Sequence, residues 1–139
     1  MATEIVVIEA RAALTREMID AGRALVGWAR ERIEIVAAFW LYLDDGNRWR
    51  LHLASPMVAE EGPIATYRAL QAMLDLRPGR QPYGLNDLEL DDVTVIEPQS
   101  ELVRLWRTVY PNGVRAGAAS AHGITIAGRH FEGAYFYLL

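Results

Sequence analysis

Three histidines are the side chains best suited to acid–base or metal chemistry near neutral pH. They are His52, His122 and His130, a residue type whose unperturbed pKa is about 6.5. His130 and Glu132 would share one face of a strand, with His122 nearby in sequence, which makes a His-Glu-His set the candidate metal site. The spacing matches no helical HExxH pattern, and we therefore predict no metal.

Nucleophilic catalysis would have to use one of three serines, Ser55, Ser100 and Ser120. Ser55 closes a predicted strand before a proline, and Ser100 falls in the first turn of a predicted helix, so both have structural explanations. The segment around Ser120 lacks glycine at the two positions that a G-x-S-x-G elbow requires. No catalytic set is therefore assigned. The enzymatic alternative is a small hydrolase or ligand-binding enzyme with His52 or His130 as base beside a carboxylate.

Three pairs of adjacent carboxylates, Asp44-Asp45, Glu60-Glu61 and Asp91-Asp92, are candidates for a metal-dependent hydrolase. Adjacent side chains on a strand point to opposite faces of the sheet, so such a pair converges only in a loop. We interpret the three pairs as a turn, a loop before a helix and the start of a strand.

The composition excludes several chemistries. All 14 basic residues are arginine, so Schiff-base and pyridoxal chemistry and the lysine of a phosphate-binding loop are absent. The chain has no cysteine, which removes thiol nucleophiles and iron–sulfur ligation. No GxGxxG pattern occurs, so a dinucleotide site is not indicated. We expect no cofactor.

The formal net charge of −4 argues against nucleic-acid binding, because that affinity comes mainly from lysine and arginine against phosphates. No apolar stretch approaches the roughly 20 residues that span a bilayer. The first residues do not resemble a secretory signal, because they lack a basic region and a long apolar run. We therefore expect no membrane association and a cytoplasmic location.

Residues 33–56 are predicted to form a β-hairpin. A three-residue loop, Asp45-Gly46-Asn47, would pair Leu43 with Trp49, Leu41 with Leu51 and Phe39 with Leu53, gathering six apolar side chains on one face. The opposite face then carries an aromatic and basic set, which is the candidate binding or interface surface: Trp40, Tyr42, Arg48, Arg50 and His52.

This predicted surface has three interpretations. Tyrosine, tryptophan and arginine are enriched at protein interfaces, which favours a partner protein. Arginine beside aromatic rings also suits a planar or anionic ligand, through stacking and paired hydrogen bonds. In the third interpretation a helix covers the aromatic rings while the arginines extend past it to water.

The remaining elements follow from periodicity and turn signals. Residues 15–32 predict a helix capped by Thr15, and Gly22 on its apolar stripe would permit close approach to a sheet. Ile64, Tyr67, Leu70, Met73 and Leu74 are expected to face inward from a second helix at 63–76. The other expected elements are a strand within 88–97, a helix at 99–110, and strands at 114–118, 124–127 and 131–138.

This order predicts one α+β domain spanning residues 1–139. We expect a mixed or antiparallel sheet of about five to six strands packed by three helices. The last predicted strand is apolar and aromatic, so it must lie inside the sheet or against another chain. Together with the aromatic hairpin face, this favours a non-enzymatic protein-interaction module that self-associates as a homodimer.

Overall fold

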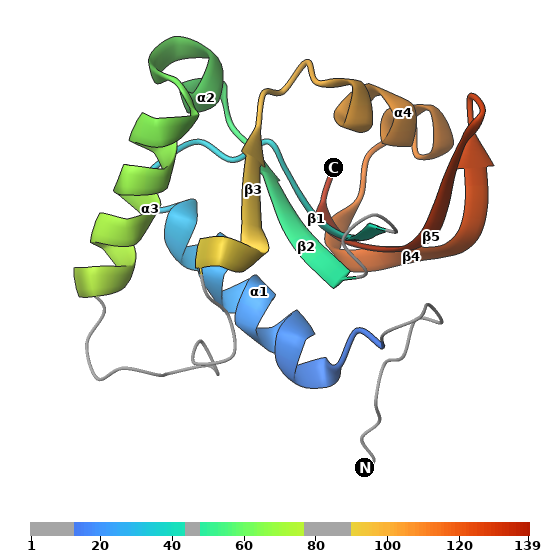
Figure 1. The fold of residues 1–139 in the computed structure, drawn as a ribbon, viewed down its shortest axis with the longest axis horizontal. Helices are drawn as coiled ribbons and strands as arrows, with labels where there is room; N and C mark the ends of the chain where they lie inside the picture. The colour runs from blue at the N-terminus through green and yellow to red at the C-terminus, as the bar shows by residue number, and fades with distance from the viewer. Residues whose placement is uncertain (1–12, 44–47, 77–89) are drawn as a thin grey trace.

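The structure, a computed structural model, describes residues 13–43, 48–76 and 90–139 and shows a single-domain α+β arrangement. Its sheet has five strands in the order β3-β2-β1-β5-β4 (Figure 1). Among the described strands only β2 and β3 pair in parallel, so the sheet is mixed, which is one of the two predicted arrangements. The strands are β1 (Ala37–Leu43), β2 (Arg48–Ala54), β3 (Val93–Ile96), β4 (Arg115–Ile126) and β5 (Arg129–Leu138).

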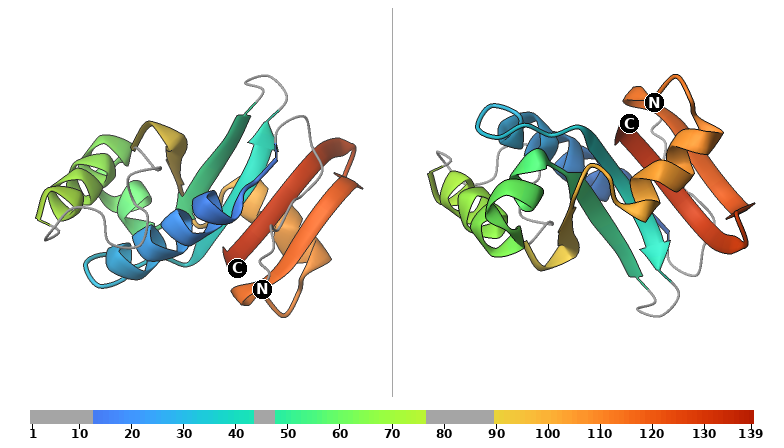
Figure 2. Two further views of the ribbon diagram at one scale, coloured as in Figure 1. Left: turned by 90° about the horizontal axis from the view of Figure 1, so that it is seen from below. Right: turned by 90° about the horizontal axis from the view of Figure 1, so that it is seen from above.

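Helices cover both faces of this sheet. α1 (Arg16–Ala29) lies below it and α4 (Glu101–Val109) lies above it, while α3 (Pro63–Leu76) stands beside the edge strand β3 (Figures 1 and 2). A short 3-10 helix, η2 (Leu90–Asp92), leads into β3. None of the helices within the described ranges is long and apolar enough to cross a membrane.

The described residues contain one α-helix more than predicted, α2 (Pro56–Glu61). From the sequence, Glu60-Glu61 was expected to lie in a loop before a helix. Pro56 occupies the first turn, and the buried Ser55 hydroxyl caps the helix by accepting a hydrogen bond from the Met57 amide at 3.2 Å. A further correction concerns Ile64, which was expected to face inward from α3 but is 67% exposed.

The predicted hairpin register is wrong by one residue. Leu43 pairs with Arg48, Leu41 with Arg50 and Phe39 with His52, so four residues connect β1 and β2. The prediction gathered the apolar side chains on one face of the hairpin and left an aromatic and basic set on the other. Both faces are buried instead, because β1 is the central strand and helices pack above and below it, so the alternation of apolar and polar residues does not define the register.

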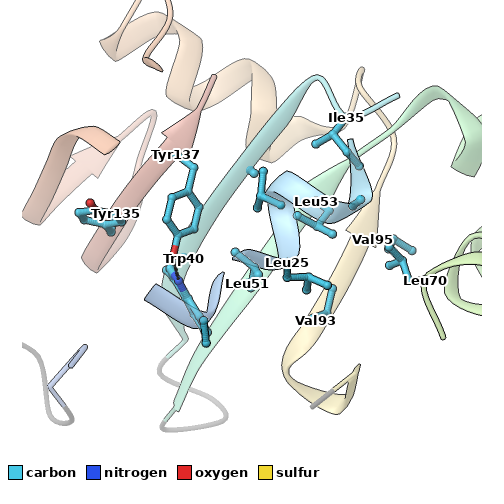
Figure 3. Close-up of a cluster of buried hydrophobic side chains, with 14 of the residues drawn as sticks. Leu25, Ile35, Trp40, Leu51, Leu53, Leu70, Val93, Val95, Tyr135 and Tyr137 are labelled. Atoms are coloured by element: carbon cyan, nitrogen blue, oxygen red, sulfur yellow. Dashed lines mark hydrogen bonds between the residues drawn. The ribbon is translucent and has the colours of Figure 1, made fainter. Parts of the chain in front are cut away.

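Two separate hydrophobic cores result. The lower core lies between the sheet, α1 and α3 and contains Leu25, Trp40, Leu51 and Tyr137 (Figure 3). The upper core lies between the sheet and α4 and is largely aromatic: Phe39, Trp106, Phe131 and Phe136. Trp106 lies 4.9 Å from the rings of both Phe131 and Phe136, measured between ring centroids.

The close approach predicted at Gly22 is present in the lower core. The Tyr137 hydroxyl donates a hydrogen bond to the Ile19 carbonyl of α1 at 2.6 Å and accepts one from Trp40 Nε1 at 2.9 Å. A Cβ atom at position 22 would lie 2.3 Å from this hydroxyl oxygen. The missing side chain therefore lets β5 contact the backbone of α1 directly.

Strands β4 and β5 form a long hairpin that curls upward toward α4 (Figure 1). Its two-residue turn is Ala127-Gly128, and both residues have the positive φ that a type I′ turn requires. The two short strands predicted at 114–118 and 124–127 are one continuous strand, because Gly123 (φ +61°) bends β4 without changing its pairing with β5.

Candidate functional site

The five residues of the predicted hairpin surface do not share one face. Trp40 and Tyr42 point into the lower core, whereas Arg48, Arg50 and His52 lie on the opposite face of the sheet with Phe39. This correction follows directly from the register. A surface that combines the aromatic and the basic side chains is therefore absent from the described part of the hairpin.

Trp40 and Tyr42 are structural residues in this arrangement. Their exposed fractions are 1% and 3%. The indole N–H of Trp40 bonds to Tyr137, and the ring of Tyr42 meets that of Trp49 edge to face at 5.6 Å between centroids. The aromatic rings are covered within the fold, as in the third interpretation, but the arginines lie on the opposite face of the sheet and do not extend past that cover to water.

His52 lies under the upper core with its ring 3% exposed. It stacks on Phe39 at 5.6 Å between centroids, and its Nδ1 lies 3.2 Å from the Arg50 carbonyl oxygen. A carbonyl only accepts, so Nδ1 carries the proton of the neutral ring. The pKa of His52 is lowered to about 4, mainly by burial and in part by the charges of Arg50 and Arg129, while the hydrogen bond to the Arg50 carbonyl acts to raise it.

The two arginines of β2 extend sideways across β3. Arg50 donates from Nε to the Thr94 hydroxyl at 2.7 Å and from Nη2 to the Val93 carbonyl at 3.1 Å. Arg48 donates to the Asp91 carbonyl at 2.8 Å and lies 3.6 Å from the Asp92 carboxylate. Both side chains therefore connect the parallel strand pair, and Asp91-Asp92 serves to start β3, as expected from the sequence.

The outer edge of β3 is closed by a tyrosine. The Tyr67 hydroxyl, from α3, donates to the Val93 carbonyl at 3.0 Å and accepts from the Val95 amide at 3.2 Å. Arg50 reaches the same carbonyl. Side chains thus occupy the backbone groups that an additional strand would need, which is one way in which proteins protect sheet edges.

We expect Tyr67→Phe to lower the free energy of unfolding by about 1–2 kcal/mol, because the Val95 amide loses its acceptor. Urea denaturation measures the loss, and hydrogen exchange should show faster exchange at Val95. Tyr110→Phe is the matched control, since Tyr110 lies on the opposite side of the sheet against Trp106. Equal effects of the two changes would contradict the capping role of Tyr67.

The other edge of the sheet is β4, the outermost strand on the side away from β3 (Figure 2). Among the described strands it pairs only with β5. From 116 to 126 its sequence is AGAASAHGITI, which contains no charged residue and no proline. Ser120, His122 and Thr125 are exposed along it. The usual protections of an edge strand, namely short length, charge and proline, are absent from this segment.

The histidines of the predicted metal set lie on this hairpin and are exposed. Thr125 pairs with His130 across it, and their side chains are 3.1 Å apart at Oγ1 and Nδ1. Within the described ranges, histidine and acidic side chains nowhere gather in a group of three that could hold a metal. His130 therefore contacts a hydroxyl, and His52 a backbone carbonyl, rather than the carboxylate that the enzymatic alternative requires.

The remaining candidates have structural roles or lie outside the described residues. Ser55 and Ser100 cap α2 and α4, and Ser120 is exposed on β4. Glu60-Glu61 ends α2, and Asp44-Asp45 lies outside the described residues. The only fully enclosed side-chain nitrogen or oxygen without a partner in the described part of the chain is Trp106 Nε1, which is surrounded by aromatic rings.

No protein-family model, curated protein or solved structure matches this chain. The candidate site must therefore be chosen on geometry, and the contrast between the two sheet edges is the clearest feature. Sequence reasoning missed both edges. The uncharged run of small residues at 116–121 was the available signal for β4, whereas nothing local to Tyr67 indicates that it reaches β3.

Proposed function

We propose that this protein is a non-enzymatic interaction module that self-associates through the outer edge of β4. The observation that supports this is the asymmetry of the sheet: Tyr67 and Arg50 block the edge at β3, while β4 presents twelve residues of edge strand. A sheet that has one edge protected by side chains and the other long and free of charged residues from 116 to 126 has an edge suited to strand pairing.

A second copy of the chain is the partner that fits best. Two β4 strands related by a two-fold axis run antiparallel, so each donates and accepts the same backbone hydrogen bonds, and two five-stranded sheets become one. The small side chain of Ala121 suits close approach. The φ of +61° at Gly123 interrupts the extended backbone of β4, and we place the pairing in the segment before it.

This proposal moves the interface from the hairpin to β4. The predicted hairpin surface is divided by the sheet, and β5, which was expected to need cover, lies between β1 and β4. The proposed homodimer thus uses a sheet edge in place of the hairpin face that the sequence suggested. A cytoplasmic location stays a prediction from the sequence.

Light scattering on a sizing column tests the proposal. We expect the wild type at high concentration to have twice the monomer mass of 15.6 kDa. Ser120→Lys should shift it toward monomer, because like charges would approach each other across the two-fold axis. Thr125→Lys, beyond the Gly123 bend, is the matched control and should remain dimeric.

Proline substitution provides a backbone test. Consecutive residues of an edge strand direct their N–H groups alternately inward and outward, so of Ser120→Pro and Ala121→Pro one disrupts pairing with β5 and the other blocks only the outer edge. The variant that keeps the wild-type circular dichroism should be monomeric. A monomeric wild type, or a folded proline variant that still dimerises, would contradict the proposal. Loss of the dimer only on deletion of residues 1–12 would also contradict it.

A further inference from the structure

Arg50 differs from the other arginines on its face of the sheet. Arg48 lies 3.6 Å from the Asp92 carboxylate, and Arg129 lies 3.6 Å from that of Glu101. The guanidinium of Arg50 instead donates to two neutral oxygens, one from Thr94 and one from Val93. Among the residues that the structure describes, no carboxylate lies within ion-pair distance of it.

The same two hydrogen bonds hold this guanidinium in place. Arg50 is half-buried, so less of its charge is hydrated than that of an exposed arginine. A guanidinium has five N–H groups in a planar fork, and the bonds to Thr94 and Val93 use two of them. The result is a fixed cation that has no counter-charge among the described residues and has N–H donors to spare. Binding an anion would therefore cost this side chain little further ordering.

We propose that Arg50 is the anchor of a binding site for a small oxyanion, a phosphate or a carboxylate, on the upper face of β2. Planar, paired donation by a guanidinium is the geometry that both groups accept best. The site does not depend on the β4 edge, because β2 and β4 are separated in the sheet by β1 and β5.

The neighbouring His52 provides a spectroscopic reporter. It follows Arg50 on the same face of β2, about 7 Å away by strand geometry. The charged groups that act on its ring are Arg50 on its own strand and Arg129 at the start of β5, and both are cationic. An anion held by Arg50 offsets this positive potential, so its binding should raise the pKa of His52.

The test titrates the full chain with inorganic phosphate and, separately, with acetate, while NMR follows the His52 ring. We expect either anion to raise the pKa of His52, by about 1 when bound close to the ring, and to raise Tm. Arg50→Gln should weaken phosphate binding at least about tenfold. Arg48→Gln, which removes the arginine that already pairs with Asp92, is the matched control and should bind as the wild type does.

Several results would overturn the site. One is the absence of any change at His52 or in Tm at phosphate concentrations up to about 100 mM, a range that detects even millimolar affinity. Equal weakening by Arg48→Gln and Arg50→Gln would indicate a diffuse charge effect. If Arg50→Gln does not fold, Arg50→Lys can be used in its place, because lysine keeps the positive charge but lacks the planar fork of N–H donors. Unchanged phosphate binding by that variant would also exclude the site. A response to phosphate but not to acetate assigns the ligand to phosphate.

Discussion

Replacing Gly22 by alanine should lower the free energy of unfolding by about 2–3 kcal/mol, although alanine is the better helix former by about 1 kcal/mol. The new Cβ would lie 2.3 Å from the Tyr137 hydroxyl oxygen and 2.9 Å from Trp40 Nε1. To relieve this overlap the Tyr137 hydroxyl must move away. It then loses both its hydrogen bond to the Ile19 carbonyl and the one that it accepts from Trp40. Buried donors without acceptors then add to the cost of overpacking.

Gly27→Ala in the same helix is the control. No atom lies within 4 Å of a Cβ built there, and the position is exposed, so only helix propensity acts. We expect a gain of about 0.5–1 kcal/mol. Urea denaturation of both variants measures the two changes in the free energy of unfolding and shows whether they have opposite signs. If Gly22→Ala stabilised the protein, α1 could not pack against Tyr137 as it does in the structure. Near-ultraviolet circular dichroism of the tyrosine and tryptophan side chains should detect any rearrangement around Tyr137.

The features that the sequence predicted correctly are those with local causes. Thr15 caps α1 through a 3.2 Å bond to the Met18 amide, and α3 has the predicted bounds, Pro63–Leu76, because proline suits a first turn. The small residue at Gly22 on an apolar stripe indicated helix–sheet contact without any knowledge of its partner. Each of these signals lies within a few residues of the structure that it specifies.

The features that it missed depend on distant parts of the chain. The hairpin register is fixed by what covers each face, and the partners of Arg50 and Tyr67 on β3 are between 26 and 44 residues away. The alternation of apolar and polar residues along the hairpin could not distinguish a solvent-exposed polar face from a face on which arginines extend sideways to a neighbouring strand. The predicted grouping of aromatic and basic side chains on one face is wrong for this reason, since Trp40 and Tyr42 pack in a core with residues of α1 and β5, which are remote in sequence.

Acidification should destabilise the protein through His52. Burial lowers the pKa of this imidazole from 6.5 to about 4, and the charges of Arg50 and Arg129 act in the same direction. In the unfolded chain the ring binds a proton below pH 6.5, whereas in the folded chain it does so only below about 4. Between these values the unfolded state holds more protons, so stability falls as the pH falls.

The size of the effect follows from the pKa difference, and comparison of variants isolates it. A lowering of 6.5 − 4 = 2.5 corresponds to a loss of about 3 kcal/mol between pH 6.5 and 4, with no contribution from this group above that window and no further loss below it. His52→Phe keeps the ring stacked on Phe39 but cannot titrate, so urea denaturation across this range should show a shallower fall than in the wild type. His122→Gln and His130→Gln, at exposed positions, should retain the wild-type fall. If His52→Phe lost stability with acid as steeply as the wild type, the imidazole would have to be accessible to protons in the folded chain. That result would contradict the description of His52 as a neutral ring buried under the upper core.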